Sequence, residues 1–364
     1  MRLLFDINHP VQVHLLKHPI AELTRRGHEC HVVARDKDVT LSLLDRLGIA
    51  YRVLAPMGRS TVGRLRELAH RELKLLGVAR DLRPHLIVGT SAHAARVGRL
   101  VGALSVVVND DDASAVPFFR WLAYPLASVI VTPDCLRHEN YGERHLTYAS
   151  YQQLFYLHPN WFQPDPAVRG QLPLAPGERY AVVRLSALGA HHDTGIRGIG
   201  EELILRLQDR LAGRVRLFVT SERGLSPRLE PLRLPTPPER LHDVLAFADF
   251  YLGDSQSVTA EAAVLGTPAF RMNDFVGRIS YLRELEDYGL AFGFKPGQED
   301  RLLQELGGTI DGADHRTVFQ RRRGKMLSDK IDPVPWFVST LEDLGVRPGN
   351  AGDGLLKRPF GPQE

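Results

Sequence analysis

Residues 249–268 carry the side chains and the local pattern of a phosphate-binding turn. The apolar run at residues 249–252 predicts a short strand, and the composition of residues 259–265 predicts a helix that Gly266 ends. Between them lie four polar residues, Asp254, Ser255, Gln256 and Ser257. Backbone N–H groups at the start of a helix lack intrahelical partners, and the helix dipole is positive there. This turn is therefore suited to binding a phosphate group.

Glu261 lies one turn into the same predicted helix. A carboxylate at this position would repel a diphosphate, but it can accept two hydrogen bonds from the hydroxyls of a ribose. It does not follow a Ser or Thr by three residues, so a capping box does not explain it. The alternative is that the acid suits the helix dipole. The turn and Glu261 together favour a site for a nucleotide.

Three consecutive acids, Asp110, Asp111 and Asp112, follow an apolar run at residues 105–108 that predicts a buried strand. Ionisation of all three is unfavourable, so we expect a raised pKa for one of them. Asp110 and Asp112 are candidates for a base that takes a proton from an acceptor hydroxyl or from a sugar. The alternative is that they cap the next helix and face water. An Asp-x-Asp pattern can also bind a divalent metal, but we predict no metal site.

A second group of polar residues surrounds the apolar run at residues 180–185. Arg184 has a permanent charge, and a Gly-punctuated loop that contains Ser186, His191 and His192 follows the run. Arg184 or a histidine can neutralise a diphosphate that leaves during group transfer. The alternative for each histidine is an exposed loop side chain.

Two further positions are weaker candidates. His14 lies just before the first predicted helix and suits a base or a sugar ligand, or else is a polar residue of a helix start. Ser221 and Glu222 end another apolar run, where they could contact a nucleotide base or ribose.

Short apolar runs alternate with amphipathic segments along most of the chain. Strands are predicted at residues 3–7, 29–34, 51–54, 86–88, 105–108 and 129–132, and later at 180–185, 215–220, 249–252 and 269–272. No G-x-G-x-x-G motif follows the first strand, which disfavours a standard dinucleotide site. The alternation predicts an α/β protein with two Rossmann-like, doubly wound parallel sheets.

A proline-dense segment breaks this alternation and predicts a linker at residues 161–176. We assign residues 1–160 to an N-terminal, acceptor-side domain, 177–345 to a C-terminal domain that binds the nucleotide-sugar, and 346–364 to a flexible tail. Ligands of parallel sheets lie beyond the carboxyl ends of the strands. We therefore expect the loops after residues 7, 108, 185 and 252 to line one cleft between two facing domains.

The overall composition excludes several classes of protein. The 364 residues carry 46 Lys and Arg against 43 Asp and Glu, a net charge of +3, which is too balanced for general nucleic-acid binding. Cys30 and Cys135 have no metal-binding spacing and favour a reducing compartment. No leader and no run of about 18 apolar residues is recognisable, so we expect a cytoplasmic protein.

Two segments are compatible with contact to the inner face of a membrane. One is the Arg-rich helix predicted at residues 58–80, and the other is the Phe-Phe-Arg-Trp run at residues 118–121. The alternative is a solvated helix face and a packed aromatic cluster.

The segment around Glu261 resembles the nucleotide-binding segment of GT-B glycosyltransferases and of UDP-N-acetylglucosamine 2-epimerases. In those families a small-residue loop and a helix Glu hold the diphosphate and the ribose of a UDP-sugar. The sequence is more similar still, over most of its length, to a family of uncharacterised bacterial and archaeal proteins predicted to be glycosyltransferases. The similarity lies in Gly-Asp-Ser-Gln-Ser at residues 253–257, Ala-Glu-Ala-Ala-Val-Leu-Gly-Thr-Pro at 260–268 and Asn-Asp-Phe-Val-Gly at 273–277.

The resemblance extends to two more loops. The neighbourhood of Asn273 and Asp274 contacts the donor sugar in related GT-B enzymes, whereas the alternative is a turn that Asn-Asp favours. Asn8 and His14 lie where the peptidoglycan N-acetylglucosaminyltransferase has a Gly-rich loop with a His, although the glycines are absent here.

These features predict a metal-independent GT-B glycosyltransferase without a cofactor. It would move a sugar from a nucleotide diphosphate-sugar, a UDP-sugar, to an acceptor that is lipid-linked or free, in the synthesis of cell-surface polysaccharide or glycoconjugate. One alternative is a UDP-sugar 2-epimerase or hydrolase. Another is a non-catalytic protein that binds nucleotide-sugars.

Overall fold

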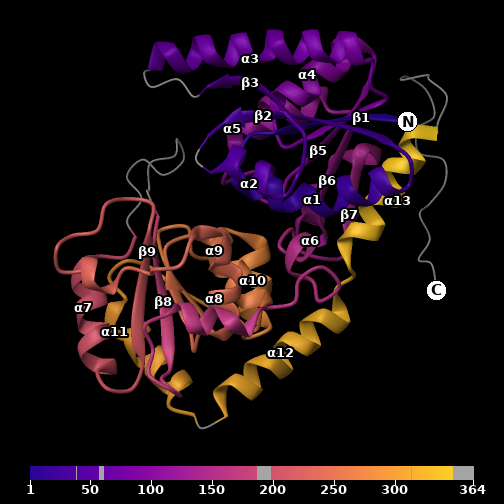
Figure 1. Ribbon diagram of the computed structural model, residues 1–364. Coiled ribbons are helices and arrows are strands. Elements are labelled where there is room, and N and C mark those ends of the chain that lie inside the picture. The colour runs from indigo at the N-terminus through magenta and orange to yellow at the C-terminus, as the bar shows by residue number, and fades with distance from the viewer. Residues whose placement is uncertain (38, 57–60, 187–197, 313, 347–364) are drawn as a thin grey trace. The chain divides into compact units, whose positions relative to one another are not determined.

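The computed structural model describes residues 1–364 except 38, 57–60, 187–197, 313 and 347–364; the side chains of residues 55, 56, 61–69 and 118 are also outside the description. The chain forms two compact units. Unit 1 comprises Met1–Tyr156 and the chain from Asp332 onward, and unit 2 comprises Leu157–Ile331. Figure 1 shows that each unit has its own sheet with helices packed on it.

Unit 1 contains a seven-stranded parallel sheet in the order β3-β2-β1-β4-β5-β6-β7. The strand order reverses direction between β1 and β4, as in Rossmann folds. The β1 segment Leu3, Leu4 and Phe5 is fully buried, because helices cover both faces of a parallel sheet. The strands are β1 Arg2–Ile7, β2 Glu29–Asp36, β3 Arg52–Pro56, β4 Leu86–Gly89, β5 Leu104–Val108, β6 Val129–Pro133 and β7 His145–Tyr148.

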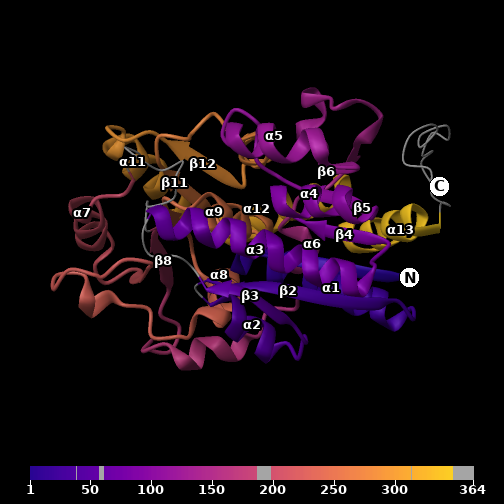
Figure 2. The ribbon, with the colours of Figure 1, turned by 90° about the horizontal axis from the view of Figure 1, so that it is seen from above.

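The helices of unit 1 connect these strands, and α3 and α4 pack side by side (Figures 1 and 2). Ser91 accepts a hydrogen bond from Ala94 N at the start of α4, and α1, α5 and α13 each begin with a proline. The helices are α1 Pro10–Arg25, α2 Thr40–Arg46, α3 Thr61–Leu82, α4 Ala92–Val101, α5 Pro117–Ala123, α6 Leu154–Leu157 and α13 Pro333–Val346.

The last helix, α13, belongs to unit 1, whereas we expected residues up to 345 to belong to the C-terminal domain. Its buried face carries Phe337, Val338 and Leu341. Phe337 meets Phe155 edge to face, with ring centroids 5.5 Å apart. Glu342 accepts a hydrogen bond from Arg26, the residue that follows α1. The chain returns to unit 1 because this apolar helix face completes the core beside α1 and α6.

Unit 2 contains a five-stranded parallel sheet in the order β12-β11-β10-β8-β9. Beyond β9, residue Arg233 forms an isolated parallel bridge to Val219. The order reverses direction between β8 and β10, and ligands of open parallel sheets bind at the carboxyl edge beside such a reversal. The strands are β8 Tyr180–Leu185, β9 Arg216–Ser221, β10 Tyr251–Gly253, β11 Ala269–Met272 and β12 Ala291–Phe294.

One continuous apolar core lies on one side of this sheet and includes Val183, Leu207, Phe250, Phe270 and Leu306. The helices of unit 2 are α7 Glu201–Leu211, α8 Leu241–Phe247, α9 Gln256–Val264, α10 Ser280–Asp287, α11 Glu299–Ile310 and α12 His315–Asp329. The structure thus confirms two parallel-sheet α/β units. Among the helices that the structure describes, none is long and apolar enough to span a membrane.

Candidate functional site

The predicted donor residues of unit 2 gather at the carboxyl edge of its sheet, where the strand order reverses between β8 and β10. Asp254, directly after β10, is 3% exposed and accepts a hydrogen bond of 2.7 Å from the backbone N–H of Ser186, directly after β8. Burial raises the pKa of Asp254, and the hydrogen bond from Ser186 opposes that shift. Asp254 therefore holds the loops after β8 and β10 together.

Asn273, in the loop after β11, also holds the loop that follows β10. Its side-chain nitrogen donates to the carbonyl of Asp254 at 2.8 Å, and its oxygen accepts from Phe275 N at 3.0 Å. The residue is 1% exposed. These contacts give Asn273 a structural task, while its neighbour Asp274 is half-buried.

Helix α9 begins at Gln256, three residues before the predicted start, because Ser255 caps it. The Ser255 hydroxyl accepts from Val258 N at 3.4 Å, and the Ser255 backbone is extended. The Thr259 hydroxyl donates back to the Ser255 carbonyl at 2.5 Å. Gln256 and Ser257 are half-buried in the first turn. Their backbone N–H groups are among the first donors of the helix, which is the arrangement that binds phosphates.

Glu261 is buried on the same helix, and it lies four residues after Ser257, so both side chains share one face. Its Oε2 lies 3.3 Å from Nε2 of His242 on α8. The carboxylate thus lies on the face of α9 that also carries Ser257, and it has a partner from a second helix. Residue spacing alone could not reveal His242, because only the packing of α8 on α9 brings it to Glu261.

Arg184 and Glu222, predicted as separate ligands, form an ion pair at the ends of β8 and β9. Arg184 donates to Glu222 Oε1 at 2.5 Å and to Thr220 Oγ1 at 3.3 Å. Ser221 accepts a hydrogen bond from Arg223 N. The pair places both charges side by side at the carboxyl edge of the sheet. The two predicted histidines, His191 and His192, lie outside the described residues.

The predicted residues of unit 1 lie at the carboxyl edge of its own sheet. Asn8 follows β1; its backbone N–H donates to Gln12 at 2.6 Å, and its side chain donates to the fully buried Asp6 at 3.3 Å. Asp6 also pairs with the buried Arg71 and accepts from Ser91 at 2.7 Å. This network shapes the loop between β1 and α1. His14 lies in α1, half-buried, with its ring 5.3 Å from that of Tyr156.

Asp110 is the acid with the raised pKa that the sequence led us to expect. Burial shifts its pKa well above the usual range, and the neighbouring Asp111 carboxylate adds to the shift. The charge of Asp110 in turn contributes to a raised pKa of Tyr148, which is caused mainly by burial. Asp112 is buried, and its carbonyl accepts from Ala115 N at 2.8 Å.

Asp112 also belongs to a group of possible metal ligands. One oxygen of Asp112, one of Glu139 and a ring nitrogen of His138 lie within 4.8 Å of one another. The Glu139 carboxylate already accepts hydrogen bonds from Ala113 N and from the Tyr141 hydroxyl. His138 Nδ1 donates to the Cys135 carbonyl at 3.1 Å. Protein donors thus account for the placement of Glu139, and we assign no ion to the group.

Comparison with known proteins shows similarity in fold. No family model matches the sequence, and no curated protein matches it. A UDP-GlcNAc 2-epimerase from Neisseria meningitidis, solved with UDP-GlcNAc, is 12% identical, with a TM-score of 0.67 over 94% of this chain and 100% of that one. MnaA of S. aureus, solved with UDP, is 14% identical, with a TM-score of 0.65 over 94% and 96%.

Glycosyltransferases are also among the similar structures. The spinosyn forosaminyltransferase SpnP is 18% identical, with a TM-score of 0.63 over 95% of this chain and 100% of that one. Identities this low establish the fold and not the reaction. The chain therefore has the GT-B fold, which these epimerases and glycosyltransferases share.

Proposed function

We propose that this protein is a glycosyltransferase that moves a sugar from a UDP-sugar to the hydroxyl of an acceptor. The observation that carries the proposal is the combination on α9 of a Ser255-capped N-terminus and the buried Glu261, at the point where the strand order of unit 2 reverses. Helix N–H groups suit the diphosphate, and a fixed carboxylate suits the two ribose hydroxyls. Asp274, at the end of β11, is proposed to contact the donor sugar.

The proposed reaction joins the acceptor oxygen to the anomeric carbon of the sugar and breaks the bond from that carbon to the β-phosphate oxygen. The N-terminus of α9 and Arg184 would stabilise the negative charge that develops on the leaving UDP, without a metal ion. The acceptor proton would pass to a base in unit 1. We propose Asp110 for this role, with Asp112 and His14 as the other candidates, because a carboxyl with a raised pKa takes up a proton at higher pH.

Two other functions use the same donor site. A UDP-sugar 2-epimerase or hydrolase is one of them, because epimerases share this fold with the glycosyltransferases. In that case a carboxylate would remove a proton from the sugar itself. A protein that binds nucleotide-sugars without turnover would need the donor site of unit 2 but would not use Asp110 or Asp112 as a base.

We also propose that the acceptor is lipid-linked and that the protein works at the inner face of a membrane. Trp121 on α5 is 77% exposed, and the apolar Leu122 and Leu100 are exposed on α5 and the adjacent α4. Arg120 and Arg99 lie beside them in sequence. Exposed apolar side chains among cations suit the headgroup region of an anionic membrane.

Cosedimentation with phosphatidylglycerol vesicles tests the membrane contact. We expect Trp121→Ala to reduce the bound fraction severalfold, whereas Val318→Ala, at an exposed apolar position of unit 2, leaves it unchanged. If both variants bind the vesicles as well as the wild type does, the proposed membrane contact through Trp121 is wrong.

The first experiment is a thermal-shift panel with UDP, GDP, dTDP, CMP and NAD. UDP should raise the melting temperature of the wild type, since a ligand that binds only the folded state stabilises it. Glu261→Ala should lose most of this shift, and Glu305→Gln, on the exposed face of α11, should keep it. If no nucleotide stabilises the folded wild type, the donor site is misassigned.

Incubation with UDP-sugars then separates the three functions. Release of UDP that depends on an added acceptor indicates transfer, an epimerised sugar without acceptor indicates epimerisation, and free sugar with water alone indicates hydrolysis. Binding without any turnover, unchanged by Asp110→Asn and Asp112→Asn, indicates the non-catalytic function.

A further inference from the structure

The Glu261 carboxylate is withdrawn from water and has a histidine partner on another helix. His242 Nε2 lies 3.3 Å from Glu261 Oε2, and the two side chains are 13% and 6% exposed. A buried carboxylate requires hydrogen-bond donors, and an imidazole N–H supplies one with a defined direction. The contact therefore restricts the orientation of the carboxylate that the proposed function places at the ribose.

The helix that carries His242 is held at its amino end. Asp243, the next residue, is buried and accepts from the backbone N–H of Asp165 at 2.8 Å. It also lies 3.2 Å from the Arg240 guanidinium, which pairs with Asp165 at 2.6 Å. The first turn of α8 is thereby tied to the chain segment around residue 165.

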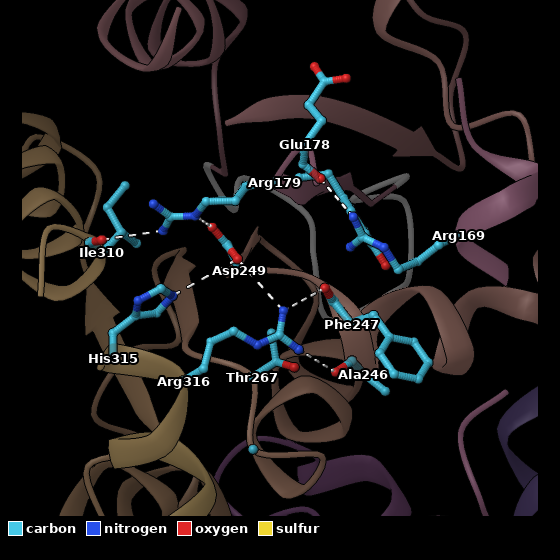
Figure 3. Close-up of polar contacts among 12 residues, drawn as sticks. Arg169, Glu178, Arg179, Ala246, Phe247, Asp249, Thr267, Ile310, His315 and Arg316 are labelled. Atoms are coloured by element: carbon cyan, nitrogen blue, oxygen red, sulfur yellow. Dashed lines mark hydrogen bonds and ion pairs between the residues drawn. The ribbon is translucent and has the colours of Figure 1, made fainter. Parts of the chain in front are cut away.

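Side chains from three other elements hold the carboxyl end of the same helix. The last four carbonyls of a helix lack intrahelical partners. In α8 the Tyr180 hydroxyl donates to the Val244 carbonyl at 2.6 Å, and the Thr267 hydroxyl donates to that of Leu245 at 2.7 Å. Arg316 donates to the carbonyls of Phe247 at 2.9 Å and Ala246 at 3.5 Å (Figure 3).

Arg316 is in turn fixed by Asp249, which is buried two residues before β10. Figure 3 shows the Asp249 carboxylate between the side chains of Arg179, Arg316 and His315. The β10 strand that follows leads directly to Ser255 and α9. Helix α8 is therefore clamped to the element that also positions Glu261, and this fixes the separation of His242 and Glu261.

The ring of His242 also has a neighbour on its side. Phe162 meets it at 80° with centroids 6.1 Å apart, in an edge-to-face arrangement. An edge-on aromatic contact limits rotation of the imidazole. The helix and the ring are thus both held, so the N–H donor is preorganised before any ligand arrives.

We propose that His242 is a positioning residue of the nucleotide site. It holds the Glu261 carboxylate in the orientation that meets a ribose diol, and by this means it sets the preference for a ribonucleotide over its 2′-deoxy analogue. The inference rests on the proposed function. Fixing a polar group before binding lowers the entropy cost of forming the complex. The gain in affinity therefore appears only with a ligand that donates both ribose hydroxyls to the carboxylate.

Isothermal titration calorimetry with UDP and 2′-deoxy-UDP tests the proposal. The wild type should bind UDP more tightly than 2′-deoxy-UDP. His242→Ala should weaken UDP binding by about tenfold, because the Glu261 carboxylate loses the hydrogen bond that orients it. The same substitution should weaken the binding of 2′-deoxy-UDP much less. His242→Gln has a side-chain amide of similar length that can donate to Glu261. It should restore most of the ratio of UDP affinity to 2′-deoxy-UDP affinity. Glu305→Gln serves as the control and should leave the ratio unchanged.

A double variant separates positioning from a direct contact. Glu261→Ala combined with His242→Ala should bind UDP no more weakly than Glu261→Ala alone, because His242 acts only through Glu261. Additive losses would overturn the proposal, and so would an equal loss for both nucleotides in His242→Ala. If His242→Ala does not fold, His242→Leu keeps the volume without the N–H and takes its place.

The two levels of the hypothesis fail in different ways. Wild type that binds neither nucleotide contradicts the proposed function itself. If the wild type binds UDP and prefers it to 2′-deoxy-UDP, but His242→Ala keeps the same preference, the role of His242 is refuted. The proposed function is then unaffected.

Discussion

At the scale of single residues, burial decides what each candidate can do. Asp254 and Asn273 carry the polar atoms of a ligand site, yet both are buried and hold the loops of unit 2 together. Arg184 and Glu222 form an ion pair. Glu261 is buried on α9, and His242 from a second helix lies beside its carboxylate. Burial raises the pKa of Asp254 and of Asp110, and at Asp110 a neighbouring acid adds to the shift.

The raised pKa of Asp110 predicts a pH dependence of stability. The folded state binds this proton more tightly than the unfolded chain does, so the favourable contribution is complete below the usual value of 3.8 and is lost as the pH rises through the raised pKa. We expect the melting temperature of the wild type to fall with rising pH more steeply than that of Asp110→Asn. Melting curves between about pH 5 and about pH 9 check this.

Asp81→Asn is the matched control for that series, because Asp81 is exposed on α3. It should show the same pH dependence as the wild type. A curve for Asp110→Asn that runs parallel to the wild type would contradict a raised pKa for Asp110.

At the scale of elements, the start of α9 combines a structural and a functional requirement. The Ser255 cap satisfies a helix N–H, and the same helix end offers further N–H groups to an anion. Gly253, just before it, must remain small, since an added Cβ would overlap the Tyr251 hydroxyl. The turn thus depends on close backbone packing as well as on polar side chains.

Two substitutions at Ser255 separate these requirements. Ser255→Ala should lower the free energy of unfolding by about 1 kcal/mol, because it removes the cap. Ser255→Asp should keep the cap and most of the stability but weaken UDP binding, because a carboxylate repels the diphosphate. Denaturant unfolding and UDP titration measure the two effects. Tight UDP binding by a stable Ser255→Asp variant would show that the diphosphate does not lie at this helix end.

At the scale of the whole molecule, the chain leaves unit 1, forms unit 2 and returns to unit 1 at Asp332. All the described residues that we propose to bind the donor lie between residues 157 and 331, whereas α13 contributes apolar side chains to the core of unit 1. Stability of unit 1 and nucleotide binding by unit 2 should therefore respond separately to substitutions.

Phe337→Ala tests this separation. It removes a fully buried ring and should cost about 3–5 kcal/mol of unfolding free energy, with UDP affinity unchanged under conditions where the protein is folded. Val346→Ala, at an 80% exposed position of the same helix, should change stability by less than about 0.5 kcal/mol. A loss of UDP affinity in folded Phe337→Ala would show that the two units are energetically coupled.

The sequence by itself determined the α/β class, the two parallel sheets, and the loop after β10 with Glu261 on the following helix. These features follow from local patterns: apolar runs of strand length, alternation with helices, and small polar residues before a helix. The sequence also indicated that one of three adjacent acids would have a raised pKa, since like charges next to each other are unfavourable whatever the fold.

Tertiary structure alone decided the partners of these residues. The contacts between Glu261 and His242, between Arg184 and Glu222, and between Asp254 and Ser186 join residues 19, 38 and 68 positions apart in the chain. Such pairs depend on which helix packs on which strand. The return of α13 to unit 1 has the same origin, because an apolar helix face fits more than one core and the sequence pattern does not name its partner.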